Sequence, residues 1–493
     1  MSLALAFASN AQRHAAKTAL FWGESRISYH DLWKQSLWVA GQLQDEFGVR
    51  RGDRVGIWLR NCPEFVPALF GIFAAGAVAV PINCFLKPVE VSFILADAGI
   101  KLLVVDESMQ DGLGKLAGPP GLRFLRAASF GRRENPGPES NLDLNEGDLA
   151  VLIYTSGTTG HPKGAMLSHG NLLANVQSCR VALEAVGEDR FAVVLPLFHS
   201  FMLTVGMLLP LLVGGSMVLI KTLHPPKSLL AEMFQHQATL LPAVPQFFRA
   251  LTHGVLPGQL PLRLCISGGA PLPATLLRDF TARFSIPLLE GYGLSEASPV
   301  VTFQPIRGPW KAGSIGQPLT DVEVTIQNDA GEILSPDKTG EVCVRGANVM
   351  QGYWNQPEAT AGALRDGWLL TGDIGHADRE GYFYITDRKK DMLLVNGINV
   401  YPREIEEVLY HYPGIKEAAV IGVPDARRGE QPLAFIAAED GVKLDEELVL
   451  EFAREQLADY KVPRRVVFLT ALPHNATGKM LKTELRNIAA KGA

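Results

Sequence analysis

The stretch YTSGTTGHPKG, residues 154–164, gathers small polar side chains around one lysine. Its glycines let backbone N–H groups approach a ligand closely, and successive N–H groups in such loops form concavities that bind anions. Lys163 adds a positive charge suited to phosphate oxygens. The hydroxyl-bearing residues that follow Tyr154 are Thr155, Ser156, Thr158 and Thr159. The stretch therefore predicts a phosphate-binding loop.

The residues before this loop, DLAVLIY at 148–154, are typical of a buried strand. The loop would then leave a strand end, which is where open α/β sheets bind ligands. Two alternatives remain open. The spacing departs from the ordinary P-loop, because two residues rather than four separate Gly157 from Gly160, and Pro162 precedes the lysine. A flexible surface turn is the other alternative, and the strand before the loop argues against it.

Composition limits the classes of protein. A length of 493 residues predicts about two to four domains. The hydrophobic content of 47% and charged content of 20% indicate a soluble globular chain. A net charge of −5 gives no basic field for nucleic acid. The five cysteines have no C-x-x-C spacing, which predicts reduced, buried thiols in a cytoplasmic protein rather than disulfides or a zinc site.

Two apolar stretches could suggest targeting or membrane insertion. The start, MSLALAFASNA, lacks the positive segment of a signal peptide, so we predict an opening helix. Residues 191–220 contain no Asp, Glu, Lys or Arg and are long enough to span a membrane. Prolines and glycines break this stretch, which favours a strand, a helix, a turn and a strand. We therefore predict no transmembrane segment, and peripheral membrane contact stays open.

Apolar strand-like runs alternate with helical patterns through the first part of the chain. This alternation predicts an α/β fold whose parallel sheets are covered by helices on both faces. The polar stretch 131–148 is predicted to be a surface loop. The apolar runs are 54–59, 77–82, 101–106, 191–196, 216–220 and 262–268.

The pattern changes after residue 313. Stretches 321–334 and 339–346 are typical of hairpin strands and predict a small antiparallel, barrel-like subdomain. Beyond 382–390 an amphipathic helix, two strands, a helix and a strand predict a compact α+β tail. We place the domain boundary so that 1–387 form the N-terminal domain and 388–493 the C-terminal domain.

Seven stretches in this order resemble the motifs of the adenylate-forming superfamily, which includes acyl-CoA synthetases, firefly luciferase and the adenylation domains of peptide synthetases. The resemblance covers essentially the whole chain and is strongest to bacterial medium- or long-chain fatty acid–CoA ligases. The stretches are YTSGTTGHPKGAMLSH (154–169), LPLFHS (195–200), ISGGAPL (266–272), GYGLSEAS (291–298), TGDIG (371–375), DRKKDMLLVNGINVYPREIE (387–406) and NATGK (475–479).

The resemblance implies a reaction in two halves. A carboxylate attacks the α-phosphate of ATP, giving acyl-adenylate and pyrophosphate, and the thiol of coenzyme A then displaces AMP. Lys479 is implied to bridge the attacking carboxylate and the phosphate. Glu296 and Thr158 are implied to hold Mg²⁺. An alternative for Glu296 is a carboxylate in the first turn of a helix capped by Ser295, a position more often Thr in the family.

For the nucleoside, the resemblance implies that Tyr292 stacks on adenine, that Asp373 accepts both ribose hydroxyls and that Arg388 reaches the ribose and phosphates. Asp373 could otherwise be a turn residue. The full set implied for ATP is Thr155, Ser156, Gly157, Thr158, Thr159, Lys163, Gly268, Gly269, Ala270, Glu290, Gly291, Tyr292, Gly293, Leu294, Ser295, Asp373, Arg388 and Lys479.

Lys390 occupies the position of the family's hinge, about which the C-terminal domain is implied to rotate between the two half-reactions. A solvated linker is the alternative for this charged stretch. Gly397 would approach the pantetheine arm of coenzyme A, and Lys461 and Arg464 would lie near its nucleotide end.

His199 is implied to shape the carboxylate end of an acyl pocket, and joins Lys479 and Glu296 as a candidate catalytic residue; a core histidine is the alternative. The other predicted pocket residues are Phe201, Val244, Gly268 and Gly293. The absence of an evident charged partner predicts an apolar monocarboxylic acid, preferably fatty, with aryl acids open. An enzyme that passes the acyl group to a carrier-protein thiol or an amine, and a non-catalytic ATP-binding protein, are the alternatives. The oligomeric state stays open.

Overall fold

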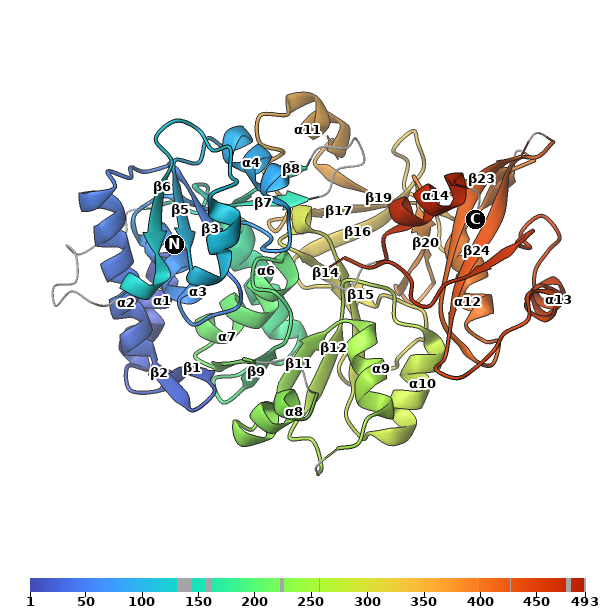
Figure 1. Ribbon diagram of the computed structural model, residues 1–493, viewed down its shortest axis with the longest axis horizontal. Helices are drawn as coiled ribbons and strands as arrows, with labels where there is room; N and C mark the ends of the chain where they lie inside the picture. The colour runs from blue at the N-terminus through green and yellow to red at the C-terminus, as the bar shows by residue number, and fades with distance from the viewer. Residues whose placement is uncertain are drawn as a thin grey trace.

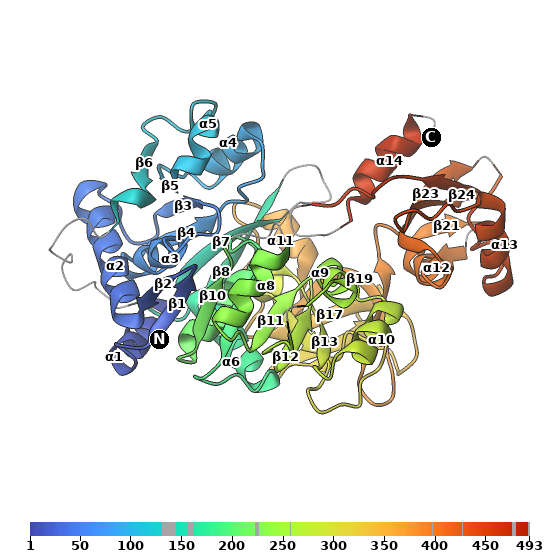
Figure 2. The same cartoon turned by 60° about the horizontal axis from the view of Figure 1, so that its bottom comes forward.

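The computed structural model describes residues 1–130, 144–155, 162–221, 226–256, 258–396, 398–425, 427–475 and 480–491. Two α/β layers carry the N-terminal half, an antiparallel sheet follows them, and an α+β unit forms the opposite end of the molecule (Figures 1 and 2). The predicted loop 131–148 lies mostly outside the described residues.

The first sheet has six described strands, parallel from β6 to β7 with β8 added antiparallel. Its interior strands β3, β4 and β5 are almost wholly buried, as their apolar runs predicted. In spatial order the strands are β6 (Arg123–Arg126), β5 (Leu102–Val105), β3 (Arg54–Trp58), β4 (Val78–Pro81), β7 (Leu149–Thr155) and β8 (Lys163–Ser168).

The second sheet has nine described strands, parallel from β13 to β1 and antiparallel at both ends. The predicted parallel sheets are thus confirmed in the interior, while the antiparallel edges were not predicted. In spatial order the strands are β15 (Gln317–Pro318), β14 (Val300–Phe303), β13 (Leu288–Gly293), β12 (Leu264–Ser267), β11 (Leu240–Ala243), β9 (Arg190–Val193), β10 (Ser216–Leu219), β1 (Thr18–Trp22) and β2 (Ser25–Ser28).

Helices cover these sheets and fill the core. Helix α1 (Leu3–Arg13) is the predicted opening helix, and the Ser2 hydroxyl accepts a hydrogen bond from Leu5 N at 3.2 Å. Phe7 of α1 stacks on Phe70 at 4.1 Å. The further helices of the N-terminal half are α2 (Tyr29–Gly41), α3 (Phe65–Ala74), α4 (Pro88–Asp97), α5 (Gln110–Leu113), α6 (His169–Ala182), α8 (Pro226–Gln235), α9 (Pro245–His253) and α10 (Ala274–Arg283).

The uncharged stretch 191–220 is divided as the sequence predicted. Strand β9 is followed by the π-helix η4 (Met202–Leu208), helix α7 (Leu209–Leu212), a turn with Gly214 at φ +79°, and β10. Across the described parts of the chain, no helix has the length and apolar character needed to cross a membrane.

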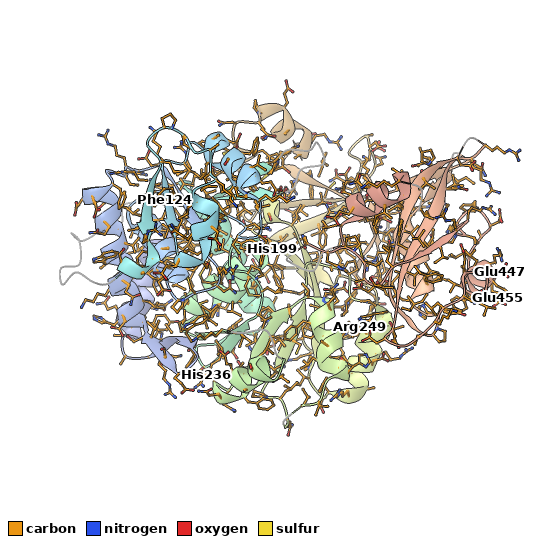
Figure 3. The ribbon with its side chains drawn as sticks, in the orientation of Figure 1. Phe124, His199, His236, Arg249, Glu447 and Glu455 are labelled. Atoms are coloured by element: carbon orange, nitrogen blue, oxygen red, sulfur yellow. The ribbon has the colours of Figure 1, made fainter. Side chains whose placement is uncertain are left out.

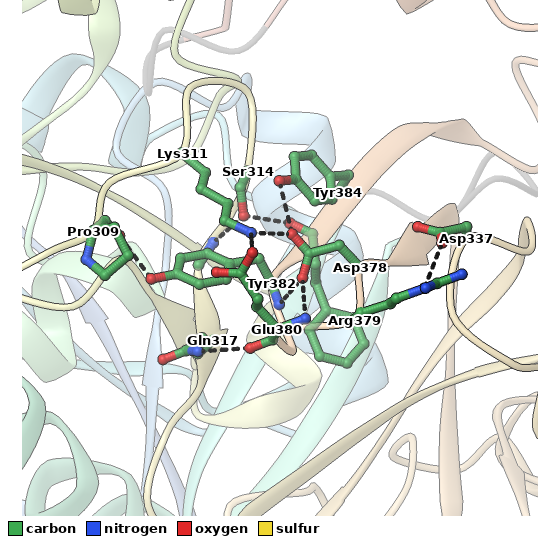
Figure 4. A network of polar contacts seen from close by, with 12 residues as sticks. Pro309, Lys311, Ser314, Gln317, Asp337, Asp378, Arg379, Glu380, Tyr382 and Tyr384 are labelled. Carbon is green, nitrogen blue, oxygen red and sulfur yellow. Dashed lines mark hydrogen bonds and ion pairs between the residues drawn. The ribbon is translucent and has the colours of Figure 1, made fainter.

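The antiparallel sheet holds the predicted hairpin strands, and a polar network fixes its edge to the preceding loop (Figure 4). Lys311 Nζ lies 2.5 Å from Asp378 and 3.1 Å from Glu380. The Tyr382 hydroxyl donates to the Pro309 carbonyl at 2.6 Å. These contacts fasten the turn between β19 and β20 to the loop that holds Pro309 and Lys311. The elements are β16 (Val322–Gln327), β17 (Gly340–Gly346), α11 (Pro357–Ala363), β18 (Leu364–Arg365), β19 (Trp368–Ala377) and β20 (Phe383–Arg388).

The C-terminal unit has the predicted α+β pattern, and in addition two short strands, β21 and β22, and a helix, α14, that were not predicted. Strand β20 still pairs with β19, and the next sheet begins at Leu393, so the boundary at 387/388 stays a prediction. The elements are β21 (Leu393–Val395), β22 (Ile398–Val400), α12 (Pro402–Leu409), β23 (Ile415–Asp425), β24 (Gly429–Ala438), α13 (Glu446–Gln456), β25 (Val466–Phe468) and α14 (Lys482–Ala490).

All five cysteines are free thiols, as predicted, but their predicted burial is only partly right. Cys179, Cys265 and Cys343 are buried, whereas Cys62 and Cys84 are partly exposed because they lie in loops after β3 and β4.

A buried carboxylate, Asp189, lies directly before the first residue of β9 in the second sheet. Both oxygens of Asp189 bond to Arg263, at 2.8 and 2.7 Å, and one accepts from Thr239 Oγ1 at 2.8 Å. Burial alone would raise the pKa of Asp189, but hydrogen bonds from Arg263, the Val186 N–H and Thr239 hold it below its ordinary value.

We expect Asp189→Asn to lower the free energy of unfolding by about 2 kcal/mol, since it breaks a largely buried ion pair whose arginine is partly exposed. A depressed carboxyl pKa contributes stability above the unfolded-state pKa, and this contribution is lost as the pH falls through the folded-state pKa. Because the folded-state pKa of Asp189 lies below the ordinary value near 3.9, the difference in unfolding midpoint between wild type and variant should stay nearly constant from pH 7 to pH 5 and narrow as the pH falls from about 4 to 2. An equal difference at pH 5 and at pH 2 would contradict this account.

Candidate active site

The predicted site residues collect where strands of both α/β sheets end. Thr155 is the last residue of β7, Gly268 follows β12, and Tyr292 and Gly293 close β13. The carboxyl ends of parallel strands are where open α/β sheets form ligand clefts. Asp373 and Arg388 come to the same region from the paired strands β19 and β20.

The first cluster, here called the phosphate end, consists of Thr155, Lys163 and Glu296. Glu296 Oε1 accepts hydrogen bonds from the Tyr353 hydroxyl at 2.9 Å and from Thr155 Oγ1 at 3.4 Å. Lys163 Nζ lies 5.2 Å from the centroid of the Tyr353 ring. The predicted residues Ser156, Gly157, Thr158 and Thr159 lie outside the described residues.

The capped-helix alternative for Glu296 is wrong. Glu296 sits in a three-residue 3-10 turn, η5 (Ser295–Ala297), whose N-cap is Leu294 and has no side-chain cap. The Ser295 hydroxyl instead pairs with that of Ser200 at 2.9 Å. This turn is too short to have a helix dipole that would favour a carboxylate at Glu296.

The donor set at the phosphate end fits Mg²⁺. That ion usually takes one or two protein carboxylates and completes its shell with phosphate oxygens and water. Among the described residues no group of three or more His, Cys, Asp or Glu could hold a metal ion. Glu296 with a nearby hydroxyl and a bound triphosphate is the arrangement that such an ion accepts.

The second cluster, here called the ribose end, consists of Tyr292, Asp373 and Arg388. The Asp373 side chain is only 2% exposed; Arg388 Nε lies 2.6 Å from one of its oxygens, and the Tyr292 hydroxyl donates to the other at 2.5 Å. Burial and the adjacent Asp373 raise the pKa of Tyr292 well above its ordinary value, so its hydroxyl stays protonated. Each carboxylate oxygen can accept a second hydrogen bond.

The third cluster, here called the acyl wall, consists of Phe201, Val244, Gly268 and Gly269. A Cβ on Gly268 would lie 3.2 Å from the Phe201 ring, and a Cβ on Gly269, whose φ is +78°, would lie 3.7 Å from Val244. A side chain at Gly268 would therefore crowd the Phe201 ring, and the positive φ at Gly269 favours glycine there. Ala270 follows it, half-buried.

Gly291, Gly293 and Leu294, which were predicted to bind ATP, make close contacts within the protein itself. A Cβ on Gly293 would come within 2.1 Å of the Pro299 carbonyl oxygen, and one on Gly291 within 2.2 Å of the Phe303 ring. The backbone N–H of Leu294 donates to that same carbonyl at 3.0 Å. These contacts explain two glycines without a ligand, so their binding roles stay predictions.

His199 is half-buried and lies near the centre of the view in Figure 3. Its Nδ1 accepts a hydrogen bond from Phe201 N at 3.3 Å, which fixes the ring beside the acyl wall. The neighbouring Ser200 makes the bond to Ser295 that joins this segment to the turn carrying Glu296.

Glu290 is a buried carboxyl group, 5% exposed, on strand β13 two residues before Tyr292. One oxygen accepts from Leu272 N at 3.0 Å. Burial raises its pKa to about 7, and the charge of Arg403 on α12 offsets only part of that rise. The pKa of Glu290 therefore depends in part on a charge carried by the C-terminal unit.

The predicted hinge residue Lys390 is exposed, and ion pairs hold the residues on either side of it. Lys389 Nζ lies 2.8 Å from Asp329 and 3.2 Å from Glu341 in the antiparallel sheet. On the other side, Asp391 pairs with Arg486 of α14 at 2.6 Å.

The predicted coenzyme A residues are only partly brought together. Lys461 pairs with Glu404 at 2.5 Å and Arg464 with Asp459 at 3.1 Å, so both cations already have carboxylate partners. Gly397 and Lys479 lie outside the described residues.

Sequence reasoning missed Tyr353 and Ser200. Tyr353 lies in MQGYWN, a stretch whose only local signal is an aromatic residue after glycine. Ser200 stood inside a recognised motif but had no assigned partner, because the Ser295 contact joins residues 95 positions apart.

The chain belongs to the AMP-binding enzyme family. The model of the AMP-binding enzyme matches residues 7–354, and that of the AMP-binding enzyme C-terminal domain matches residues 404–479. The chain is therefore an enzyme of the adenylate-forming superfamily, in its acyl-CoA synthetase branch.

Two relatives and two solved structures illustrate the similarity. The chain is 36% identical to a long-chain-fatty-acid–CoA ligase of Bacillus subtilis, over 97% of this chain and 92% of the relative. It is 38% identical to a feruloyl-CoA synthase of an Amycolatopsis species, over 95% of each. ATP-bound MatB from Rhodopseudomonas palustris superposes with a TM-score of 0.91 at 33% identity, over 99% of each chain. The o-succinylbenzoate coenzyme A synthetase of Bacillus subtilis, with ATP and magnesium, gives 0.88 at 30%, over 98% and 99%.

We expect Glu290→Gln to stabilise the enzyme at pH 8 and to change little at pH 5. A carboxyl group with a raised pKa favours folding below the unfolded-state pKa near 4.3, and this advantage is lost as the pH rises towards 7. The gain at pH 8 should be roughly 2–3 kcal/mol, measured as the shift in thermal unfolding at both pH values.

The control is Glu455→Gln, an exposed carboxylate on α13 at the edge of the molecule (Figure 3). This variant should shift unfolding little at either pH. A Glu290→Gln effect of the same size at pH 5 and pH 8 would show that ionisation of this group is not the cause.

Proposed function

We propose that this enzyme activates an apolar monocarboxylic acid, in the first instance a medium- or long-chain fatty acid, as its acyl-adenylate. It then transfers the acyl group to the thiol of coenzyme A and releases AMP. The observation that carries the proposal is the Ser200–Ser295 hydrogen bond of 2.9 Å. It joins the residue before Phe201, on the acyl wall, to the residue before Glu296, at the phosphate end.

The chemical difficulty of the first half-reaction is the repulsion between a carboxylate and a polyanionic phosphate. Cations and backbone N–H groups aimed at the phosphate lower that barrier electrostatically. Lys163 would hold the outer phosphates, Arg388 the ribose side and Lys479 the α-phosphate with the attacking carboxylate. A magnesium ion held by Glu296 would add positive charge along the triphosphate.

Binding of the nucleoside would use the ribose end. Asp373 keeps acceptor capacity on both oxygens, so the two ribose hydroxyls can donate to it while Arg388 stays in place. The Tyr292 hydroxyl donates to one of these oxygens, and its ring would stack on adenine.

The acyl wall supports an apolar substrate. Phe201 and Val244 are apolar side chains that lie against the two glycines. The long-chain-fatty-acid–CoA ligase relative supports a fatty acid. An aryl acid is the second candidate, which the feruloyl-CoA synthase relative favours at a similar level of identity.

For the second half-reaction we propose that the chain divides into 1–387 and 388–493 and rotates at Lys390. The ion pairs of Lys389 and Asp391 belong to different units, so a change of backbone angles between them would move one unit against the other. The β21–β22 hairpin exposes Leu394 and Ile398, at 49% and 46%. Such a surface suits a hairpin that packs against coenzyme A after rotation.

The test is pyrophosphate release by the purified enzyme with magnesium, ATP and a panel of acids, with and without coenzyme A. Fatty acids should give acyl-adenylate alone and acyl-CoA when coenzyme A is present. Turnover with ferulate-like acids only would select the aryl alternative. Adenylate without any use of coenzyme A would point to a carrier-protein thiol or an amine, and no adenylate with any acid would refute the proposal.

We expect Lys479→Ala to abolish adenylate formation, by a factor of 100 or more, and to leave thioesterification of a supplied acyl-adenylate within about threefold of wild type. The reason is that the proposed charge acts only while carboxylate and phosphate meet. Pyrophosphate release and acyl-CoA formation measured separately check this, with Lys491→Ala as a surface control. Equal loss in both halves would contradict the assignment.

A further inference from the structure

Tyr353 lies in a segment that is fastened to the strand after the phosphate loop. Its backbone extends the edge of β8: Met166 N donates to Gly352 O at 2.9 Å, and Trp354 N donates to Gly164 O at 2.8 Å. The same segment reaches η5, where Met350 N donates to the carbonyl of Glu296 at 2.8 Å. Tyr353 is thus fixed between two parts of the phosphate end.

The Tyr353 side chain contacts both charged members of that cluster. Its hydroxyl donates to Glu296 Oε1 at 2.9 Å, and the Lys163 ammonium lies over its ring at 5.2 Å from the centroid. Burial and the nearby Glu296 raise the pKa of Tyr353 far above its ordinary value, so the hydroxyl remains a donor. A cation over a tyrosine ring is a favourable contact.

The two hydroxyl contacts on Glu296 fall on one oxygen. Tyr353 and Thr155 both donate to Oε1, and no described residue donates to Oε2. A carboxylate fixed through one oxygen presents the other in a set direction. Partners of this kind set the orientation and affinity of metal ligands.

We propose that Tyr353 is a positioning residue for the metal–nucleotide complex. Its hydroxyl directs Glu296 Oε2 towards magnesium, and its ring holds Lys163 beside the triphosphate. This inference rests on the proposed function. A positioning role differs from a purely structural role in what the two parts of the side chain affect. The hydroxyl should govern the magnesium dependence of ATP binding. The ring should also govern ATP binding in the absence of metal.

The test uses full-length enzyme and ATP without any acid, so that binding rather than turnover is measured. Calorimetric titrations are made over a range of magnesium concentrations and in excess chelator. Tyr353→Phe should raise the magnesium concentration for half-maximal tightening of ATP binding by about tenfold. Its affinity for ATP in chelator should stay within about twofold of wild type.

Tyr353→Leu removes the ring as well. It should show the same shift in magnesium dependence and, in addition, an ATP affinity in chelator lower by about fivefold, because Lys163 loses its aromatic contact. The matched control is Tyr384→Phe, which removes another tyrosine hydroxyl that donates to a carboxylate, Asp378, at 3.2 Å. This control should leave both titrations unchanged.

A double variant tests whether the hydroxyl acts through Glu296. In a Glu296→Gln background, Tyr353→Phe should cause no further shift in magnesium dependence, since the group it orients is gone. Thermal unfolding of each variant shows whether the fold is retained.

The outcomes separate this inference from the proposed function. Wild-type enzyme that binds no ATP with magnesium would overturn both. Wild-type binding with an unshifted magnesium dependence in Tyr353→Phe would overturn only the role of Tyr353. Equal losses with and without metal, or full additivity with Glu296→Gln, would also overturn it and leave a structural tyrosine.

Discussion

The carboxylate of Glu296 is held by hydroxyl groups from two segments that lie far from it in the chain, Thr155 and Tyr353. The rest of the site depends on this convergence. It brings the end of β7, the turn after β13 and the segment beside β8 to one point. A carboxylate in such a place favours cations, and the ring of Tyr353, whose hydroxyl donates to Glu296, also lies under the Lys163 ammonium.

The protein treats its buried carboxylates in contrasting ways. Asp189 is paired with Arg263 and serves the sheet, and burial is outweighed there by hydrogen bonds. Asp373 is equally buried and also paired, yet it lies at a strand pair that opens towards the site. Glu290 has only a backbone donor and a distant arginine, so burial prevails and its pKa rises. Burial by itself therefore does not separate the carboxylate that serves the sheet from those predicted for the site.

Polar contacts join the C-terminal unit to the rest of the enzyme. Gln246 on α9 donates to Glu417 on β23 at 3.1 Å, and the Asp387 carboxylate accepts from Arg403 N at 2.8 Å. Replacing polar contacts by contacts with water costs less free energy than exposing a packed apolar interface, which suits units that rearrange. The apolar core of the C-terminal unit is its own, built around β23, β24 and α12.

The sequence alone determined the alternation of apolar strands and helices, the antiparallel segment, the α+β tail and the family. These features follow from local periodicity and from motifs that are contiguous in the chain. It also placed Thr155, Glu296, Asp373 and Arg388 as candidates. Only the tertiary structure decided that Ser295 pairs with Ser200 rather than capping a helix, that Tyr353 joins the phosphate end, and that Lys461 has a carboxylate partner. Such contacts join residues tens to hundreds of positions apart, and no local pattern encodes which distant side chains a folded backbone brings within hydrogen-bonding distance.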